Sequence, residues 1–253
     1  MDFKKIGETH NCTKILVKGI DATLLNSIRR AAMNSVPTFA IEDVTIYDNN
    51  SALFDEYLVH RISMAPIKSD HTQYKAGDIV KFVLDKEGPG MVYSRDIKST
   101  DPKIEFIDKN VPIAKLKKDQ RIRLEAEAVV GKGKDHVKWQ SALIAFREIP
   151  KVSFETKLIK DPKKFIAECP KGVLEQKAGK IIVSDPINVN IDLLLKCADI
   201  APPGAMTVGY DSDSFVITVD NYGNHKLADI FSLAVEAIRE KAKEFRGEMK
   251  KIK

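Results

Sequence analysis

The cysteines carry the most distinctive chemistry in this sequence. Cys169 stands before Pro170 in the stretch CPKGVLE, and a Cys-Pro pair closes the bacterial iron–sulfur motif C-x2-C-x2-C-x3-C-P. The stretches FIAECPKGVL (165–174) and CADIAPPGAM (197–206) align with each other at an offset of 32 residues. This weak internal repeat fits the spacing of a ferredoxin-like module with two cluster sites.

Most of the ligands that such clusters need are missing. The motif's cysteine positions fall mainly on apolar residues: Ile159, Pro162, Phe165 and Cys169 in the first half, and Ile191, Leu194, Cys197 and Ala201 in the second. Since the fourth cysteine of each run serves the other cluster, one cluster would have no thiolate and the other only two, where four are needed. We therefore expect a ferredoxin-like module lacking cluster ligands, with apolar replacements filling the core and no cofactor.

The two remaining thiols belong to one former cluster site. Cys169 and Cys197 are therefore vestigial cluster positions that we expect to lie close together. Two alternatives are that these thiols form a disulfide or that they bind a metal ion together with ligands from another molecule. In a reducing cytosol we favour buried, inert thiols over both. A ferredoxin-like redox or iron–sulfur protein is the alternative function.

No other set of residues has the spacing of a catalytic or metal site. The stretch GKGKDHVKW lacks the spacing and following helix of a phosphate-binding loop. Asp211 and Asp213 are better explained by a turn than by bound magnesium. The neighbours His60 and Arg61 are interpreted as helix residues that contact a neighbouring element. The histidines are scattered without metal-ligand spacing: His10, His60, His71, His136 and His225.

The composition bounds the class of protein. Of 253 residues, 43% are apolar, which is enough for a real core. The net charge of +5 arises from 41 basic and 36 acidic residues that are well mixed, which does not indicate a dedicated nucleic-acid binder. The start lacks the apolar stretch of a signal peptide, and no run approaches the roughly 20 apolar residues of a membrane span. With only three cysteines, these features favour a cytoplasmic protein without membrane contact.

The N-terminal segment predicts a strand and then an amphipathic helix. Residues 12–20 have the pattern of the strand. Asp21 is a good N-cap residue, and Pro37 ends the helical pattern beyond Ser35. Apolar side chains at three- and four-residue spacings give the helix one apolar face: Leu24, Leu25, Ile28, Ala32 and Met33.

The middle of the chain is dominated by strand patterns. Residues 39–49 predict a strand, residues 51–65 a helix and residues 78–130 a β meander. Residues 143–149 predict a further short strand that ends at Pro150. The stretch DSDSFVITVDNYG (211–223) predicts a turn, a strand and a second turn.

One strand of the predicted meander is especially clear. In RIRLEAEAVV, Ile122, Leu124, Ala126 and Ala128 alternate with charged residues. One face of this strand should therefore be buried and the other solvated.

The chain closes with a long predicted helix from about His225 to Lys250. Its apolar stripe spans about five turns: Leu227, Ile230, Phe231, Ala234, Val235, Ile238, Ala242 and Phe245. The stripe could simply face the chain's own core. Both terminal segments have broad apolar faces, however, and the units between them look separate. We therefore favour association with another subunit.

Two long segments carry a family resemblance. Residues 24–67 and 136–150 closely resemble the archaeal RNA polymerase D subunits, the counterparts of the eukaryotic third-largest subunit and of the bacterial α amino-terminal domain. The helix signature of that family is Leu-x-Asn-x-x-Arg-Arg, here Leu24, Asn26, Arg29 and Arg30. Two further motifs belong to its archaeal and eukaryotic branch: Glu56, His60 and Arg61, and the pair Lys138 and Trp139. The resemblance covers essentially the whole chain.

The resemblance implies an α+β architecture in three parts. Residues 1–40 and 209–253 would form a discontinuous, α-like dimerisation domain. Residues 41–150 would be a β-rich domain inserted into it, and residues 151–208 the ferredoxin-like module.

The resemblance also implies a scaffold that is not an enzyme by itself. It would pair with subunit L, carry the two large catalytic subunits and the small subunits N and P, and meet DNA only through the complex. The twin arginines would lie near the second-largest subunit, where guanidinium groups suit contacts to carboxylates and carbonyls. The expected interface comprises nine residues: Leu24, Leu25, Ile28, Arg29, Arg30, Ala32, Phe231, Val235 and Ile238.

Overall fold

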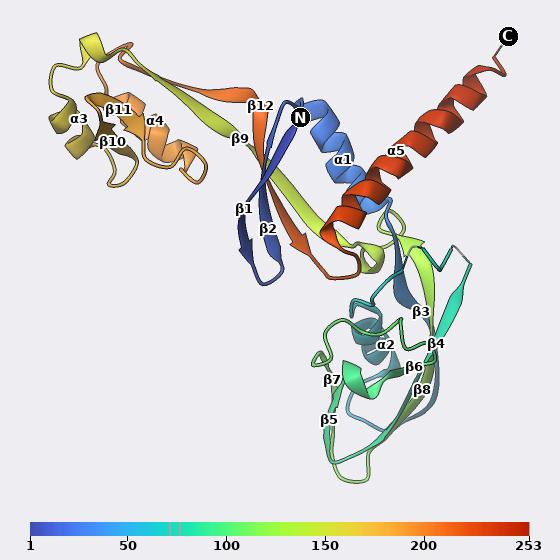
Figure 1. Cartoon of the computed structure of the whole chain (residues 1–253). Coiled ribbons are helices and arrows are strands. Elements are labelled where there is room, and N and C mark those ends of the chain that lie inside the picture. The colour runs from blue at the N-terminus through green and yellow to red at the C-terminus, as the bar shows by residue number, and fades with distance from the viewer. Residues whose placement is uncertain (71, 76, 253) are drawn as a thin grey trace. The chain divides into compact units, whose positions relative to one another are not determined.

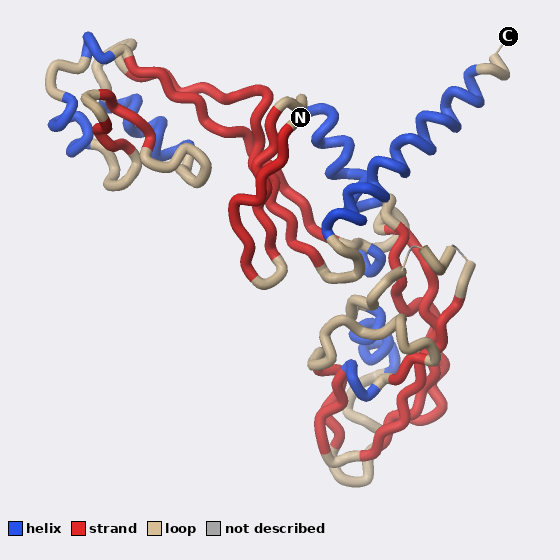
Figure 2. The backbone as a smooth tube through the Cα atoms, in the orientation of Figure 1, coloured by secondary structure: helices blue, strands red, loops and turns tan. Residues whose placement is uncertain are grey.

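A computed structural model of the chain describes residues 1–70, 72–75 and 77–252. The chain forms two compact units, one of residues 1–7, 14–23 and 145–218 and the other of residues 8–13, 24–144 and 219–253. Helices and antiparallel strands combine in a mixed α and β fold, which confirms the predicted class at that level (Figures 1 and 2). The predicted three-part division of the chain stays a prediction.

The elements follow in this order: β1 (Asp2–Thr9), β2 (Cys12–Lys18), α1 (Ala22–Asn34), β3 (Pro37–Asn49), α2 (Asp55–Ser63), β4 (Ile79–Glu87), β5 (Gly90–Tyr93), β6 (Lys98–Ser99), β7 (Pro112–Leu116), β8 (Arg121–Lys132), β9 (Ala142–Phe154), α3 (Pro162–Glu168), β10 (Leu174–Lys177), β11 (Lys180–Val183), α4 (Ile191–Ile200), β12 (Met206–Asn221) and α5 (Leu227–Met249). Short 3-10 turns add η1 (Ser94–Asp96), η2 (Val137–Trp139) and η3 (Thr156–Leu158). Within the described residues, no helix is both long enough and apolar enough to cross a membrane.

The second unit is built on a sheet with the strand order β3-β8-β4-β6. The predicted alternation along β8 is confirmed, because Ile122, Leu124, Ala126 and Ala128 are fully buried. Helix α2 packs against the sheet and contributes the fully buried Leu58 to the same core (Figure 1). This core holds β3, β8, β4 and α2 together as one layered domain.

The predicted meander is wrong in its strand order. A meander pairs strands that are neighbours in sequence, but β8 lies between β3 and β4 and pairs antiparallel with both. Strands β5 and β7 form a separate ladder. The apolar alternation of β8 identifies a half-buried strand but does not specify its neighbours, because pairing depends on side chains that are far apart in sequence.

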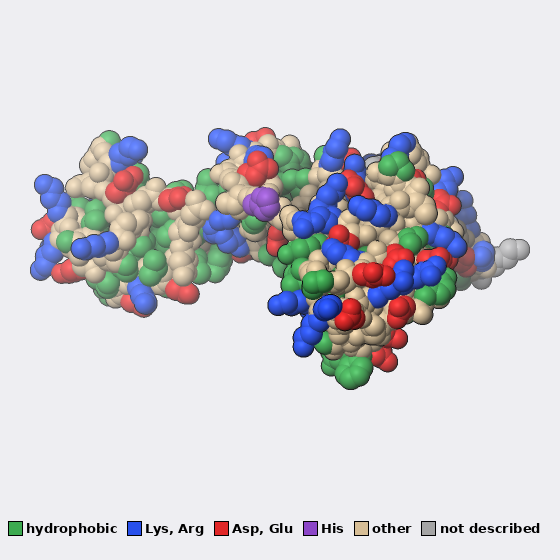
Figure 3. Space-filling model, turned by 90° about the horizontal axis from the view of Figure 1, so that it is seen from below, with side chains coloured by type: hydrophobic (Ala, Val, Ile, Leu, Met, Phe, Trp, Pro, Cys, Tyr) green, Lys and Arg blue, Asp and Glu red, His purple; other side chains and the backbone are tan. Residues whose placement is uncertain are grey.

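The solvated face of this sheet carries charged pairs across the strands. Arg121 contacts Asp85 at 2.7 Å, and Lys81 contacts Glu127 at 3.5 Å. Such exposed pairs each contribute at most about 1 kcal/mol. Figure 3 shows the same mixing of basic and acidic side chains over one face of the molecule, in line with the well-mixed charge of the sequence.

The first unit contains strands of a second sheet, with the order β1-β2-β12-β9. The sequence pattern did not indicate β1, because this edge strand is mostly exposed and has no apolar alternation. Strand β9 does not end at Pro150 but continues to Phe154. Proline is tolerated there because β9 is an edge strand, where one side needs no ladder hydrogen bond.

The predicted turn at Asp211 and Asp213 is also wrong. Strand β12 runs without interruption from Met206 to Asn221. The Asp211 side chain instead accepts a hydrogen bond from the backbone N–H of Asp213 at 3.2 Å, and the Asp213 carbonyl accepts one from Gly19 at 2.8 Å. Both aspartates are therefore parts of the strand and its local hydrogen bonding.

Candidate partner interface

Helix α1 carries the residues of the family's helix signature, and the structure explains their spacing. The Arg29 Nε and Nη2 atoms both donate to the side-chain oxygen of Asn26, at 3.1 and 3.0 Å. Residues three apart lie on the same face of a helix, which makes this pairing geometrically easy. The Nη1 atom of Arg29 also reaches the carbonyl oxygen of Ile144, at 3.5 Å. Arg29 thus ties α1 to the start of β9, a contact that the sequence pattern alone did not suggest.

Arg30, the second arginine, has a different role. Its side chain is exposed, and it lines a cavity of about 250 Å³ between α1 and α5. Lys241 brings a second cation to this cavity from α5, and Ile238 contributes an apolar wall. Asn26, Ser27, Asn34 and Ser35 supply amides and hydroxyls. This arrangement is suited to a partner surface that offers carboxylates or carbonyl groups.

Helix α5 is buried only along its first half. Ile230 and Ala234 have no exposed surface, whereas residues 239–250 are all exposed, including Phe245 at 68%. Figure 1 shows this outer half extending beyond α1. The predicted apolar stripe is therefore present, but its outer part contacts little within the unit.

The nine predicted interface residues differ in how deeply they are buried. The exposed members are Leu24 and Arg30; the half-buried members are Ile28, Arg29, Phe231, Val235 and Ile238; the buried members are Leu25 and Ala32. Their contact with a partner stays a prediction. The two buried residues lie in the chain's own core, so they would support such a surface from inside.

The motif Lys138-Trp139 fastens the loop before β9 to strands β3 and β8. The buried Trp139 ring donates from Nε1 to the carbonyl oxygen of Val129 at 3.2 Å. The Lys138 ammonium lies 4.4 Å above that ring and donates to the Ile41 carbonyl oxygen at 2.9 Å and to the Glu42 carboxylate. These contacts join β3, β8 and the loop before β9.

Gly131, near the end of β8, and Gly133, just after this strand, allow the backbone to pass close to its neighbours. A Cβ atom at Gly131 would lie 2.3 Å from the Trp139 ring, and one at Gly133 would lie 2.1 Å from the Met33 carbonyl oxygen. The Lys134 N–H then donates to the Asn34 carbonyl oxygen at 2.9 Å, at the end of α1. The two glycines of GKGK therefore indicate close backbone approach. Testing this stretch only as a phosphate-binding loop did not reveal that role.

Replacing Gly131 with alanine should lower the free energy of unfolding by about 1–3 kcal/mol, because the added methyl group overlaps the Trp139 ring. Trp139 is the only tryptophan in the sequence, so its fluorescence during urea unfolding reports on this unit. The control is Gly247→Ala, which meets nothing within 4 Å and should be neutral or slightly stabilising. Equal stability of the two variants would contradict the assigned packing.

The ferredoxin-like repeat has a structural counterpart at the same offset of 32 residues. Helix α3 ends before Cys169 and α4 ends before Ala201, with similar extended backbone at both residues. Gly172 and Gly204 then adopt φ angles of 80° and 78°, a left-handed conformation that favours glycine. Strands β10 and β12 begin two residues after each glycine. Two copies of one helix–turn–strand unit therefore face a shared core.

Most of the positions that align with the cluster motif lie in that core. The buried members are Ile159, Phe165, Cys169, Leu194, Cys197 and Ala201. Cys169 and Cys197 are both buried in this core and lie close enough to influence each other's pKa. Burial is the main reason that the pKa of Cys169 rises from 9.0 to about 12, and it also raises the pKa of Cys197. These residues do not fit a [4Fe–4S] cluster, because they offer two thiols where four thiolates are needed.

Alkylation of the native chain at pH 8 should modify Cys12 and spare the other two cysteines. The thiolate is the reactive form, and a pKa of about 12 leaves on the order of one Cys169 in ten thousand ionised at that pH. Cys12 is only half-buried. Mass spectrometry after iodoacetamide treatment should find one modified thiol in the folded chain and three in urea, and none in folded Cys12→Ser. Rapid native modification of Cys169 or Cys197 would contradict the assigned burial.

No catalytic constellation forms among the residues that the structure describes. No three His, Cys, Asp or Glu side chains there could hold a metal ion together. His136 accepts from the Lys138 N–H at 3.1 Å, and His225 Nε2 lies 2.8 Å from the Pro37 carbonyl oxygen. Arg61 donates to the Pro112 carbonyl oxygen at 2.6 Å, while His71 lies outside the described residues. These polar contacts hold elements together within the second unit.

Comparison with known proteins identifies the family. Residues 44–150 match the RNA polymerase Rpb3/RpoA insert domain, which places the β3–β8 sheet and α2 in a class of RNA polymerase domains. The protein named DNA-directed RNA polymerase subunit Rpo3 in Methanosarcina acetivorans is 37% identical over 247 residues, or 91% of each chain. The protein of the same name in Thermococcus kodakarensis is 31% identical over 100% of this chain and 99% of its own. The chain belongs to the family of archaeal RNA polymerase Rpo3 subunits, which confirms the resemblance at that level.

Proposed function

We propose that this chain is the non-catalytic assembly subunit of an archaeal DNA-dependent RNA polymerase, equivalent to the D subunits that its sequence resembles. The observation that carries the proposal is similarity to Rpo3 subunits along nearly the whole chain, at 37% identity over 91% of its length. The hydrogen-bonded Asn26–Arg29 pair and the exposed Arg30 agree with it, because they give the family's helix signature separate internal and surface roles.

The proposed partner surface comprises α1 and α5. A small partner, subunit L, would cover the half-buried side chains Ile28, Phe231, Val235 and Ile238 and the exposed outer half of α5. Burying apolar surface contributes roughly 25 cal/mol per Å², so covering such a helix is a strong driving force for pairing. The resulting pair would form the platform for the two large catalytic subunits, with the small subunits N and P attached. Contact with DNA would come only through the assembled complex.

We further propose that the ferredoxin-like module is a structural part of this scaffold and holds no iron–sulfur cluster. The support is the apolar core at the former ligand positions, in which only Cys169 and Cys197 are thiols. Anaerobically purified chain should therefore contain neither iron nor acid-labile sulfide in stoichiometric amounts. A cluster absorbing near ~400 nm, bound through these two thiols, would overturn this part of the proposal.

Co-purification from the native archaeal host tests the assembly role. A tagged chain should retain a small partner and the two large polymerase subunits through gel filtration, identified by mass spectrometry. The control is the tagged chain mixed with lysate after purification, which measures non-specific capture. Elution of the freshly expressed chain alone would contradict the proposal.

A further inference from the structure

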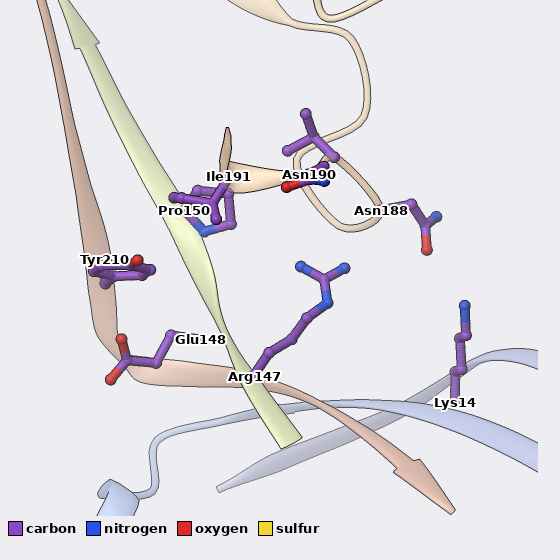
Figure 4. A pocket seen from close by; sticks show the side chains of 9 residues that line it. Lys14, Arg147, Glu148, Pro150, Asn188, Asn190, Ile191 and Tyr210 are labelled. Carbon is purple, nitrogen blue, oxygen red and sulfur yellow. The ribbon is translucent and has the colours of Figure 1, made fainter. Parts of the chain in front are cut away.

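The first unit contains a second cavity, of about 580 Å³, that none of the roles above uses. This size lies within the range of ligand-binding clefts. Its wall is made by three strands and by the loop before α4: Lys14 from β2, Arg147, Glu148 and Pro150 from β9, Tyr210 from β12, and Asn188, Val189, Asn190 and Ile191 from the loop and α4. Figure 4 shows Lys14, Arg147 and Asn188 directed toward the same space.

One end of this cavity is cationic. Lys14 and Arg147 are both exposed, and Arg147 is held in place because its guanidinium donates to the carbonyl oxygen of Ile187. The nearby Asp185 carboxylate is occupied by its own loop, since it accepts from the backbone N–H groups of Ile187 and Asn188 and from the Asn188 amide. Hydrogen bonds from Asn188 lower the pKa of Asp185 most, and the charge of Arg147 lowers it further. Arg147 therefore already faces one carboxylate, and an incoming anion would be a second partner for its guanidinium.

The other end of the cavity is apolar and aromatic. Pro150, Ile191 and the ring of Tyr210 line it, and Tyr210 is 57% exposed. The Glu148 carboxylate also lines this end, beside Tyr210, so the apolar wall carries one acidic group (Figure 4). The cavity therefore joins a site for a carboxylate to a wall for an apolar side chain.

We propose that this cavity binds an extended segment of another polymerase subunit in which an Asp or Glu lies next to an apolar residue. The carboxylate of the bound segment contacts Lys14 and Arg147, since a guanidinium can donate two parallel hydrogen bonds to a carboxylate. The apolar neighbour packs on Pro150 and Tyr210. The Asn190 oxygen already accepts from the Asp192 N–H and caps α4, so only the NH₂ group of Asn190 is offered to the segment's backbone. A polypeptide fits better than a free anion, because an anion would leave the apolar wall uncovered. This inference rests on the proposed assembly function.

Site-specific cross-linking in the assembled polymerase tests the inference. A benzoylphenylalanine in place of Tyr210 should cross-link to one peptide of another subunit, with an Asp or Glu within a few residues of the attachment point. The double variant Lys14→Glu/Arg147→Glu should reduce that cross-link and weaken retention of the same subunit at least about tenfold. Replacing the partner's carboxylate with lysine should restore both. The control Lys157→Glu reverses an exposed charge of the same unit outside the cavity and should change neither.

The outcomes separate this inference from the proposed function. Polymerase that assembles around the chain, but cross-links to a segment without a carboxylate, to nucleic acid or to nothing, overturns the inference and leaves the assembly role intact. Equal retention by the double variant and the control also overturns it. Failure of the unmodified chain to enter any polymerase overturns the assembly role instead.

Discussion

Replacing Leu194 with aspartate should open the core that contains Cys169 and Cys197. Leu194 is fully buried in this core, beside Cys197 in α4. The substitution removes a large apolar side chain and places a carboxylate where no partner charge lies among the described core residues. We expect a loss of about 4 kcal/mol or more, which corresponds to about a thousandfold larger population of opened module.

The two buried thiols report this opening. The alkylation rate of Cys169 and Cys197 under native conditions should rise in proportion to the opened population. Leu195→Asp is a matched control, because it makes the same change one residue further along α4 at a side chain that is 47% exposed. It should change the rate by less than about threefold, since exposed substitutions usually cost at most about 0.5 kcal/mol. Equal rates in the two variants would mean that the former cluster position is not core.

Replacing Val235 with glutamate should largely abolish pairing with the small partner. Val235 is half-buried on the stripe of α5, next to the fully buried Ala234. In the proposed pair the partner covers it, and an unpaired charge would be buried there at a cost of about 3–5 kcal/mol. This cost corresponds to at least about a hundredfold loss of affinity, measurable by titration of the co-expressed partner.

A control on the same helix separates the interface from a general effect of charge. Glu236→Lys changes the charge at the next residue, an exposed position that faces a different direction from Val235. The partner should bind this variant with an affinity within about threefold of the unmodified chain. Val235→Glu should also have the same Trp139 fluorescence and the same midpoint of urea unfolding as the unmodified chain. The reason is that the side chain at position 235 is partly exposed to solvent before pairing. Unchanged partner affinity in Val235→Glu would exclude this residue from the interface.

Local patterns in the sequence predicted much of the fold. The alternation in β8 marks its buried face, since side chains of a strand alternate between two faces. The repeat around Cys169 and Ala201 marks two similar helix ends, because the same turn requires the same proline and glycine. The limits of α1 follow from Pro37 and from its apolar spacing. Each of these features depends on residues that are close together in the chain.

The features that the sequence did not reveal depend on residues far apart. The order β3-β8-β4-β6 is decided by pairing between distant strands. The contact of Arg29 with Ile144 also joins separate segments. The cavity of Lys14 and Arg147 brings together residues that have no common motif. Such sites become visible only when the chain is folded.

Reconstitution of the polymerase with and without this chain tests the central claim most directly. The account predicts that omission of the chain leaves the two large subunits unassembled on a glycerol gradient and prevents RNA synthesis from a primed template. The chain alone should incorporate no nucleotides, and adding it back should restore both assembly and synthesis. Assembly and full synthesis by the remaining subunits without this chain would contradict its role as the scaffold.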